Sequence, residues 1–176
     1  MKKSLFCCKI MGFIFTSIAG ILLHFLYDWS NQTLFFALFS AINESIWEHM
    51  KLLFFSMFLF AWIESNFLEK NYDNFWQIKL IGILSGILLI PIFYYSYTGI
   101  FGIKIDWINI AIFFITTAIS YLIETHLFKY KTTSFLSSQT ALIILCLVAF
   151  LFVIFTFVPP HIPLFEDPAT KLYGIQ

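Results

Sequence analysis

Long apolar runs recur along this sequence, and they restrict the possible folds more than any other feature does. Four of them occupy residues 10–27, 78–98, 106–127 and 139–158. A helix of about 20 mostly apolar residues crosses the hydrocarbon core of a bilayer. Hydrophobic residues make up 60% of the chain and charged residues 11%, a composition more apolar than a single soluble core requires. We therefore predict an all-α, integral membrane helical bundle that forms one domain over residues 1–176.

A fifth apolar stretch, residues 33–68, is too long for one straight crossing. A helix rises 1.5 Å per residue, so this stretch would exceed a hydrocarbon core of about 30 Å. Asn43 is a favourable N-cap residue, and Glu44 would lie at the positive end of a helix dipole. We expect a short, non-spanning apolar segment at 33–42 and a spanning helix at 44–66, which gives five transmembrane helices. One long helix that projects from the membrane is the alternative.

The lysines beside these spans predict the orientation of the bundle. Cytoplasmic loops of membrane proteins carry an excess of positive charge. A cytoplasmic N-terminus places the larger group of lysines inside and the smaller group outside. The inner group is Lys2, Lys3, Lys9, Lys70, Lys79, Lys129 and Lys131, and the outer group is Lys51, Lys104 and Lys171. The C-terminal tail, residues 159–176, is then extracytoplasmic, and its prolines predict a turn-rich segment.

The segment NESIWEHMK, residues 43–51, places four ionisable side chains between two apolar runs. They are Glu44, Glu48, His49 and Lys51. A charged side chain at the centre of a membrane helix costs at least about 2.5 kcal/mol, and interfacial positions cost less. An ordinary helix ion pair near the lipid headgroups would explain two of the four groups. The density of charge favours a functional site.

Other polar residues are predicted to gather at the same face of the membrane. His24 and Asp28 lie one helical turn apart at the end of the first span and face the same way. Consecutive helices usually pack side by side, so this pair is expected beside residues 43–51. The tail adds His161. Asp28 with His24 also has a simpler interpretation, an interfacial pair without a function.

A second polar cluster is predicted at the opposite, cytoplasmic end of the bundle. Glu64 closes the second span, and Glu124 and His126 close the fourth. Because Lys129 and Lys131 follow closely, these residues are interpreted first as interfacial anchors. Their alternative role is to receive a proton or cation from the outer cluster.

Three segments of the chain resemble a family of small, multi-span bacterial membrane proteins, chiefly from Firmicutes, that has no assigned function. They are HFLYDWS (24–30), NESIWEHMKLLFF (43–55) and PPHIPLFEDPATKLYGI (159–175). The resemblance implies a polytopic fold in a bacterial cell membrane. It also implies a set of recurrent polar positions, which are His24, Asn43, Glu44, Trp47, Glu48, His49, Lys51, His161, Asp167 and Pro168. It adds nothing for the cytoplasmic cluster.

These residue types suggest an enzyme with a divalent metal such as zinc. A catalytic zinc keeps three protein ligands and a water, and it lowers the pKa of that water towards 7. The expected reaction is hydrolysis of an ester or amide in a lipid or lipid-linked substrate. The pool of possible ligands is His24, Asp28, Glu44, Glu48, His49 and His161, and the expected metal ligands among them are His24, Asp28, His49 and His161. The expected catalytic residues are Glu44, Glu48 and His49. The supporting residues are Asn43, Trp47, Lys51 and Asp167. The spacings H-x3-D and E-x3-E-H are not diagnostic metal motifs.

Two other classes of function use the same residues. An interrupted apolar segment resembles the broken helices that bind substrates in transporters, and five spans would require a homo-oligomer for that role. The third class is a non-catalytic scaffold or regulatory subunit, held together by residues 43–51 and the tail. The formal net charge is zero and basic runs are lacking, so a nucleic-acid partner is not expected. The lipid bilayer is the expected surrounding.

Overall fold

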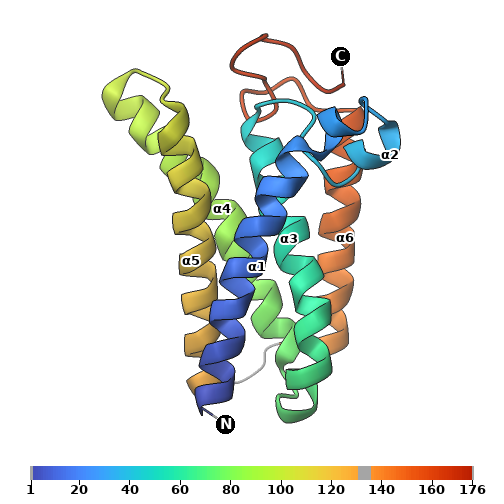
Figure 1. Ribbon diagram of the computed structural model, residues 1–176, viewed down its shortest axis with the longest axis vertical. Helices are drawn as coiled ribbons and strands as arrows, with labels where there is room; N and C mark the ends of the chain where they lie inside the picture. The colour runs from blue at the N-terminus through green and yellow to red at the C-terminus, as the bar shows by residue number, and fades with distance from the viewer. Residues whose placement is uncertain (1, 131–135, 176) are drawn as a thin grey trace.

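The computed structural model describes residues 2–130 and 136–175, and within these ranges the fold is helical (Figure 1). Five helices are long and apolar enough to cross a membrane, which confirms the predicted all-α architecture with five spans. The helices are α1 (Lys2–Trp29), α2 (Leu34–Ala37), α3 (Ile46–Leu68), α4 (Phe75–Phe101), α5 (Asp106–Tyr130) and α6 (Ser138–Phe157), and a 3-10 turn follows α3 at Glu69–Asn71.

The long helices α1, α3, α4 and α5 form a ring in which each packs against its neighbours, and α6 lies against α4 and α3. The two chain termini lie at opposite ends of the bundle (Figure 1). We call the end that carries α2 and residues 159–175 the tail end, and the opposite end the amino end. Towards the tail end, α4 and α5 lean away from α1 and α3 (Figure 1).

The segment between α1 and α3 contains no helix long enough to cross a membrane. Asn31 and Gln32 adopt left-handed backbone angles, with φ of 54° and 58°, and they end α1 by reversing the chain. The helix α2 that follows is only four residues long. The predicted break is therefore confirmed, and the alternative of one continuous helix over residues 33–66 is wrong.

The start of α3 differs from the prediction by two residues. The helix begins at Ile46, and its N-cap is Ser45, whose hydroxyl accepts a hydrogen bond from the Glu48 N–H at 3.4 Å. The expectation of Asn43 as N-cap was wrong. Asn43 instead holds the loop, since its Oδ1 accepts from the Ser45 N–H and its Nδ2 donates to the Gly174 carbonyl. The spacing Ser45-x-x-Glu48 is that of a capping box and could have indicated the correct start.

The C-terminal tail folds back over the first turn of α3. The Trp47 N–H, which has no partner within the helix, donates to the Leu164 carbonyl at 3.0 Å. The Trp47 ring packs against Phe165 with 4.6 Å between centroids. Asp167 accepts a hydrogen bond from the Ala169 N–H and so closes a turn. The tail is turn-rich, as predicted.

An exposed ion pair also stabilises the tail. Lys171 Nζ lies 2.9 Å from Glu166 Oε1. The backbones at Glu166 and Tyr173 form an isolated antiparallel β-bridge. The hydrogen bond from Lys171 lowers the pKa of the Glu166 carboxyl below its usual range. This pairing is confined to the surface of the tail.

Candidate functional site

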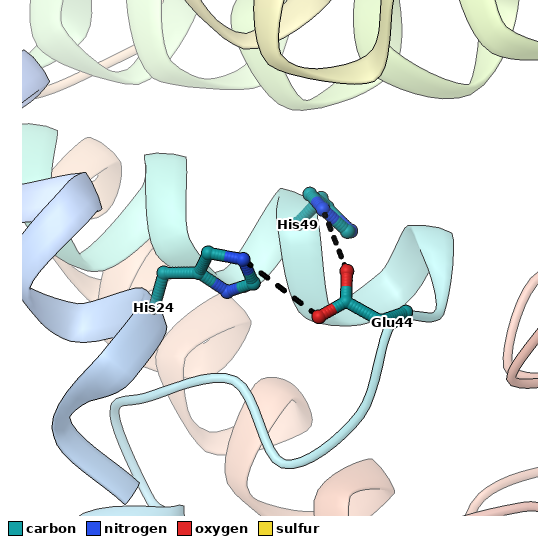
Figure 2. Close-up of side chains that lie close together, drawn as sticks. All are labelled: His24, Glu44 and His49. Carbon is teal, nitrogen blue, oxygen red and sulfur yellow. Dashed lines mark ion pairs between the residues drawn. The ribbon is translucent and has the colours of Figure 1, made fainter. Parts of the chain in front are cut away.

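Three of the predicted residues converge at the tail end of the bundle (Figure 2). His24 comes from the last turns of α1, Glu44 from the loop before α3, and His49 from the first turn of α3. The Nε2 atoms of His24 and His49 each lie 3.7 Å from a carboxylate oxygen of Glu44. Two imidazole nitrogens and one carboxylate oxygen lie within 4.8 Å of one another, an arrangement that can hold a metal ion. We call these three residues the His–Glu–His cluster.

The local fold fixes the orientation of the His49 ring. Its Nδ1 lies 2.9 Å from the Ser45 carbonyl oxygen. A carbonyl only accepts hydrogen bonds, so Nδ1 carries the proton and Nε2 faces Glu44. The distance of 3.7 Å between Nε2 and the carboxylate is longer than a hydrogen bond. It is close to the roughly 3.4 Å that separates ligand atoms in a tetrahedral zinc site with bonds of about 2.1 Å.

Two small cavities border the cluster where α4 and α5 lean away from α1 and α3. The first, of about 20 Å³, is lined in part by Glu44, His49 and Tyr94. The second, of about 70 Å³, extends from His24 and His49 towards the outer surface between α1 and α5. Asn109 lines both. A cavity of at least about 10–15 Å³ can hold a water, so the first has room for one beside the cluster.

The other predicted metal ligands lie elsewhere. Asp28 is exposed one turn beyond His24 and does not belong to the His–Glu–His cluster. His161 is also outside the cluster, and its ring stacks on Tyr173 with 4.7 Å between centroids. The structure therefore brings together His24, Glu44 and His49 from the predicted pool of ligands.

Glu48 and Lys51, expected as a catalytic residue and an outer lysine, form a buried pair. Lys51 Nζ lies 2.5 Å from Glu48 Oε2, and the two side chains are exposed by 0% and 3%. Lys51 also donates to the Ala37 carbonyl at the end of α2 and to the Thr156 hydroxyl on α6. Glu48 accepts from the Ile42 N–H. The pair joins α2, α3 and α6. The partners of Glu48 and Lys51 named here are not members of the His–Glu–His cluster.

A ring of four buried charges lies towards the amino end. Each helix of the α1, α3, α4, α5 ring supplies one member, which are Lys9, Glu64, Lys79 and Glu124 in that order. The four nitrogen–oxygen distances around the ring are 2.7 to 2.8 Å. Gly82 makes room for it, since a Cβ atom there would lie 2.4 Å from Glu124 Cγ. We call this group the charge ring.

The charge ring corrects three expectations. Glu64 and Glu124 are not interfacial anchors, because both are almost completely buried. Lys9 and Lys79 are buried as well, although they were placed among the flanking lysines. His126 does not join the ring, and its side chain packs on Tyr130. Lys131 lies outside the described residues.

Comparison with known proteins assigns the chain to a family. A model of the family described as "Family of unknown function (DUF6512)" matches residues 2–175. The chain belongs to the DUF6512 family. This confirms the resemblance to an uncharacterised family seen in the sequence. No curated protein and no solved structure matches the chain.

The geometry of this DUF6512 protein divides the polar residues by role. Asn43, Trp47, Glu48 and Lys51 hold the loop, the tail and α3 together. His24, Glu44 and His49 point their ligand atoms at one another beside two cavities. Sequence reasoning did not identify Asn109 on the cavity walls. A polar amide inside the apolar fourth span was the available signal.

Proposed function

We propose that this DUF6512 protein binds a divalent transition metal, most simply zinc, through His24, Glu44 and His49, and that it is a metal-dependent membrane hydrolase. The observation that carries the proposal is the convergence of three ligand atoms from three separate segments. The hydrogen bond from His49 Nδ1 to the Ser45 carbonyl supports it, because metal-binding histidines usually donate their other ring N–H to such a partner.

The number and type of ligands favour catalysis over a structural role. Two histidines and one glutamate leave the fourth position of a tetrahedral zinc open, as in catalytic sites, whereas structural sites fill all four with protein ligands. A bound zinc lowers the pKa of its water to about 7 and so supplies a nucleophile at neutral pH. The cavity of about 20 Å³ at Glu44 and His49 has room for that water.

The two alternatives receive different support. Transport requires a polar path between the His–Glu–His cluster and the charge ring. The fully buried residues between them are of mixed polarity, with Leu53, Phe54 and Met57 beside the hydroxyl residues Ser56, Thr117 and Ser120. Neither cavity at the cluster is lined by a residue of the charge ring, so transport has less support than a metal site. A scaffold role fits the contacts of the tail with α3. Those contacts involve residues other than His24 and His49, so they are compatible with a metal site beside them.

Metal content tests the proposal. Protein purified in detergent, loaded with zinc and dialysed should retain about one zinc per chain by elemental analysis. Losing a partner of a ligand weakens metal binding about 10- to 100-fold, so losing a ligand through His49→Ala or Glu44→Gln should weaken it by at least about 100-fold in chelator competition. His126→Ala and His161→Ala are matched controls, because they remove histidines outside the cluster. Equal zinc retention by His49→Ala and the two controls would falsify the metal site.

The location of the site stays a prediction, namely the outer face of a bacterial cytoplasmic membrane. The distribution of lysines supports it, because cytoplasmic loops carry an excess of positive charge. Apart from Lys9, Lys51 and Lys79, more lysines belong to the group predicted inside than to the group predicted outside. In a variant with serine at Cys7, Cys8 and Cys146, His161→Cys should react with a membrane-impermeant maleimide in intact cells. Asn71→Cys, exposed at the amino end, should stay unlabelled until the cells are opened. The reverse pattern of labelling contradicts this orientation.

A further inference from the structure

Asn109 is held in one orientation beside the His–Glu–His cluster. It lies in the first turn of α5, and its Oδ1 accepts a hydrogen bond of 2.7 Å from the Tyr97 hydroxyl. That hydroxyl accepts in turn from the Ile105 N–H at 3.4 Å, which leaves its own proton for Asn109. The carboxamide oxygen is therefore engaged. Among the described residues, the two N–H donors of Nδ2 have no hydrogen-bond partner.

Asn109 belongs to the walls of both cavities. Asn109 and His49 line the smaller cavity with Glu44, and they line the larger one with His24. A fixed N–H donor beside a reacting carbon stabilises an oxygen that gains negative charge during acyl transfer. Asn109 thus has the chemistry of a donor to a substrate oxygen.

The larger cavity approaches the cluster from the side of the bundle. Its lining includes Ile21 on α1 and Ile110 on α5, which are 47% and 60% exposed. Both residues lie in helices that can span the membrane, so these exposed side chains face lipid. A ligand that enters between them comes from the bilayer. An acyl chain is the chemical group that such an entrance accepts.

The charges around the cavities restrict the head of that ligand. Glu44 is the charged residue among the described residues that line them, and no lysine lines either cavity. The chain contains no arginine. Arginine and lysine are the usual partners of phosphate oxygens. A neutral carbonyl therefore fits this site better than a phosphodiester does.

We infer that the substrate is a lipid with a neutral ester or amide bond, that its acyl chain lies between Ile21 and Ile110, and that Asn109 donates hydrogen bonds to its carbonyl oxygen. The inference rests on the proposed metal-dependent hydrolysis. It adds a substrate class, a route of entry and a catalytic residue to that proposal.

The reaction balances with water alone. The water oxygen forms a bond to the carbonyl carbon, and the π electrons of the C=O bond move to the carbonyl oxygen, where the Asn109 N–H groups stabilise the negative charge. When those electrons return, the bond to the leaving oxygen or nitrogen breaks. The leaving atom takes the proton given up by the water. The products are a carboxylic acid and an alcohol or amine.

Turnover by the zinc-loaded full-length protein tests the inference. The probes are a monoacylglycerol, an N-acyl amide of the same chain length and a phosphatidylcholine labelled to report phosphodiester cleavage, each in mixed micelles. Wild-type protein should hydrolyse an acyl probe and leave the phosphodiester intact. Asn109→Ala should lower kcat about 100- to 1,000-fold, as the loss of one oxyanion donor does, with little change in KM. Tyr97→Phe, which frees the amide to rotate, should lower kcat less.

Matched variants separate entry from chemistry. Ile21→Trp, which fills the entrance, should raise KM at least tenfold, whereas Ile14→Trp, an exposed isoleucine two turns earlier on α1, should not. Asn66→Ala is the control for Asn109, because Asn66 is exposed and bonds only to its own helix.

Zinc content, measured on every variant, distinguishes the two levels of proposal. If the wild-type protein does not bind zinc, the proposed function itself is overturned. Normal zinc content with no turnover of either acyl probe, with cleavage of the phosphodiester, or with an unchanged kcat in Asn109→Ala overturns the inference about substrate and Asn109 and leaves the metal site standing.

Discussion

Replacing Lys79 with methionine is expected to lower the free energy of unfolding by about 3–5 kcal/mol, the usual cost of leaving a buried charge without its partner. Lys79 is fully buried, and its Nζ lies 2.7 Å from both Glu64 and Glu124. Without it, two carboxylates face each other with only Lys9 between them. Two neighbouring carboxylates repel each other strongly in a medium of low dielectric constant.

The measurement is thermal or denaturant unfolding in detergent, followed by intrinsic tryptophan fluorescence. Lys70→Met is the matched control, since Lys70 is exposed in the turn after α3, and it should change stability by less than about 0.5 kcal/mol. Methionine at all four positions of the charge ring should restore much of the loss, because an apolar replacement of a whole buried ion cluster is often neutral. Equal stability of the Lys79 and Lys70 variants would show that the ring does not stabilise the fold.

Replacing Lys51 with methionine should have a similar effect, about 3–5 kcal/mol, at the other end of the bundle. The change leaves Glu48 buried without a counter-charge and removes donors to the Ala37 carbonyl and the Thr156 hydroxyl. The loss should be concentrated in α2 and residues 38–45, whose attachment to α3 depends on this pair. The rate of hydrogen exchange should therefore rise more at the amides of α2 and residues 38–45 than at the amides of α3.

Glu44→Gln is the complementary variant. The Glu44 side chain is 55% exposed, so its loss should leave unfolding nearly unchanged while it abolishes zinc retention. Lys51→Met, conversely, should keep normal zinc affinity in the fraction that remains folded. If Glu48→Gln or Lys51→Met instead removes zinc without changing stability, the buried pair belongs to the metal site and its structural assignment is wrong.

The sequence was sufficient for the spans and for part of the site. Helix length and hydropathy define the five crossings, because the bilayer leaves few other ways to satisfy backbone hydrogen bonds. The position of His24 near the end of one span and of His49 near the start of the next was enough to predict their proximity. Glu44 was predicted both as a catalytic residue and as a member of the pool of possible ligands, because its position next to the expected helix start placed it at the same face of the membrane.

The charge ring could not be predicted in the same way. Hydropathy started two of the predicted spans at residues 10 and 78, next to Lys9 and Lys79, so both lysines were counted among those that flank the spans on the cytoplasmic side. The structure extends α1 and α4 past both residues and turns them inward. Burial of a charge depends on partners from other helices, and the spacing of residues along one helix carries no information about them. Asp28 and His161 were grouped with the site because they were expected at the same depth in the membrane. Residues at the same depth need not be in contact, and these two lie outside the cluster.

The charge ring also has a consequence for how the chain is made. Lys9 belongs to α1, and both of its carboxylate partners, Glu64 and Glu124, are synthesised after it, Glu124 by 115 residues. At 5–20 residues per second, the amine waits about 6 to 23 s for that carboxylate. During this time the long, flexible lysine side chain can keep its charge near the lipid headgroups. The helix α1 is therefore expected to insert with its amino end shallow and to reach its final depth after its partners on α3 and α5 have been synthesised.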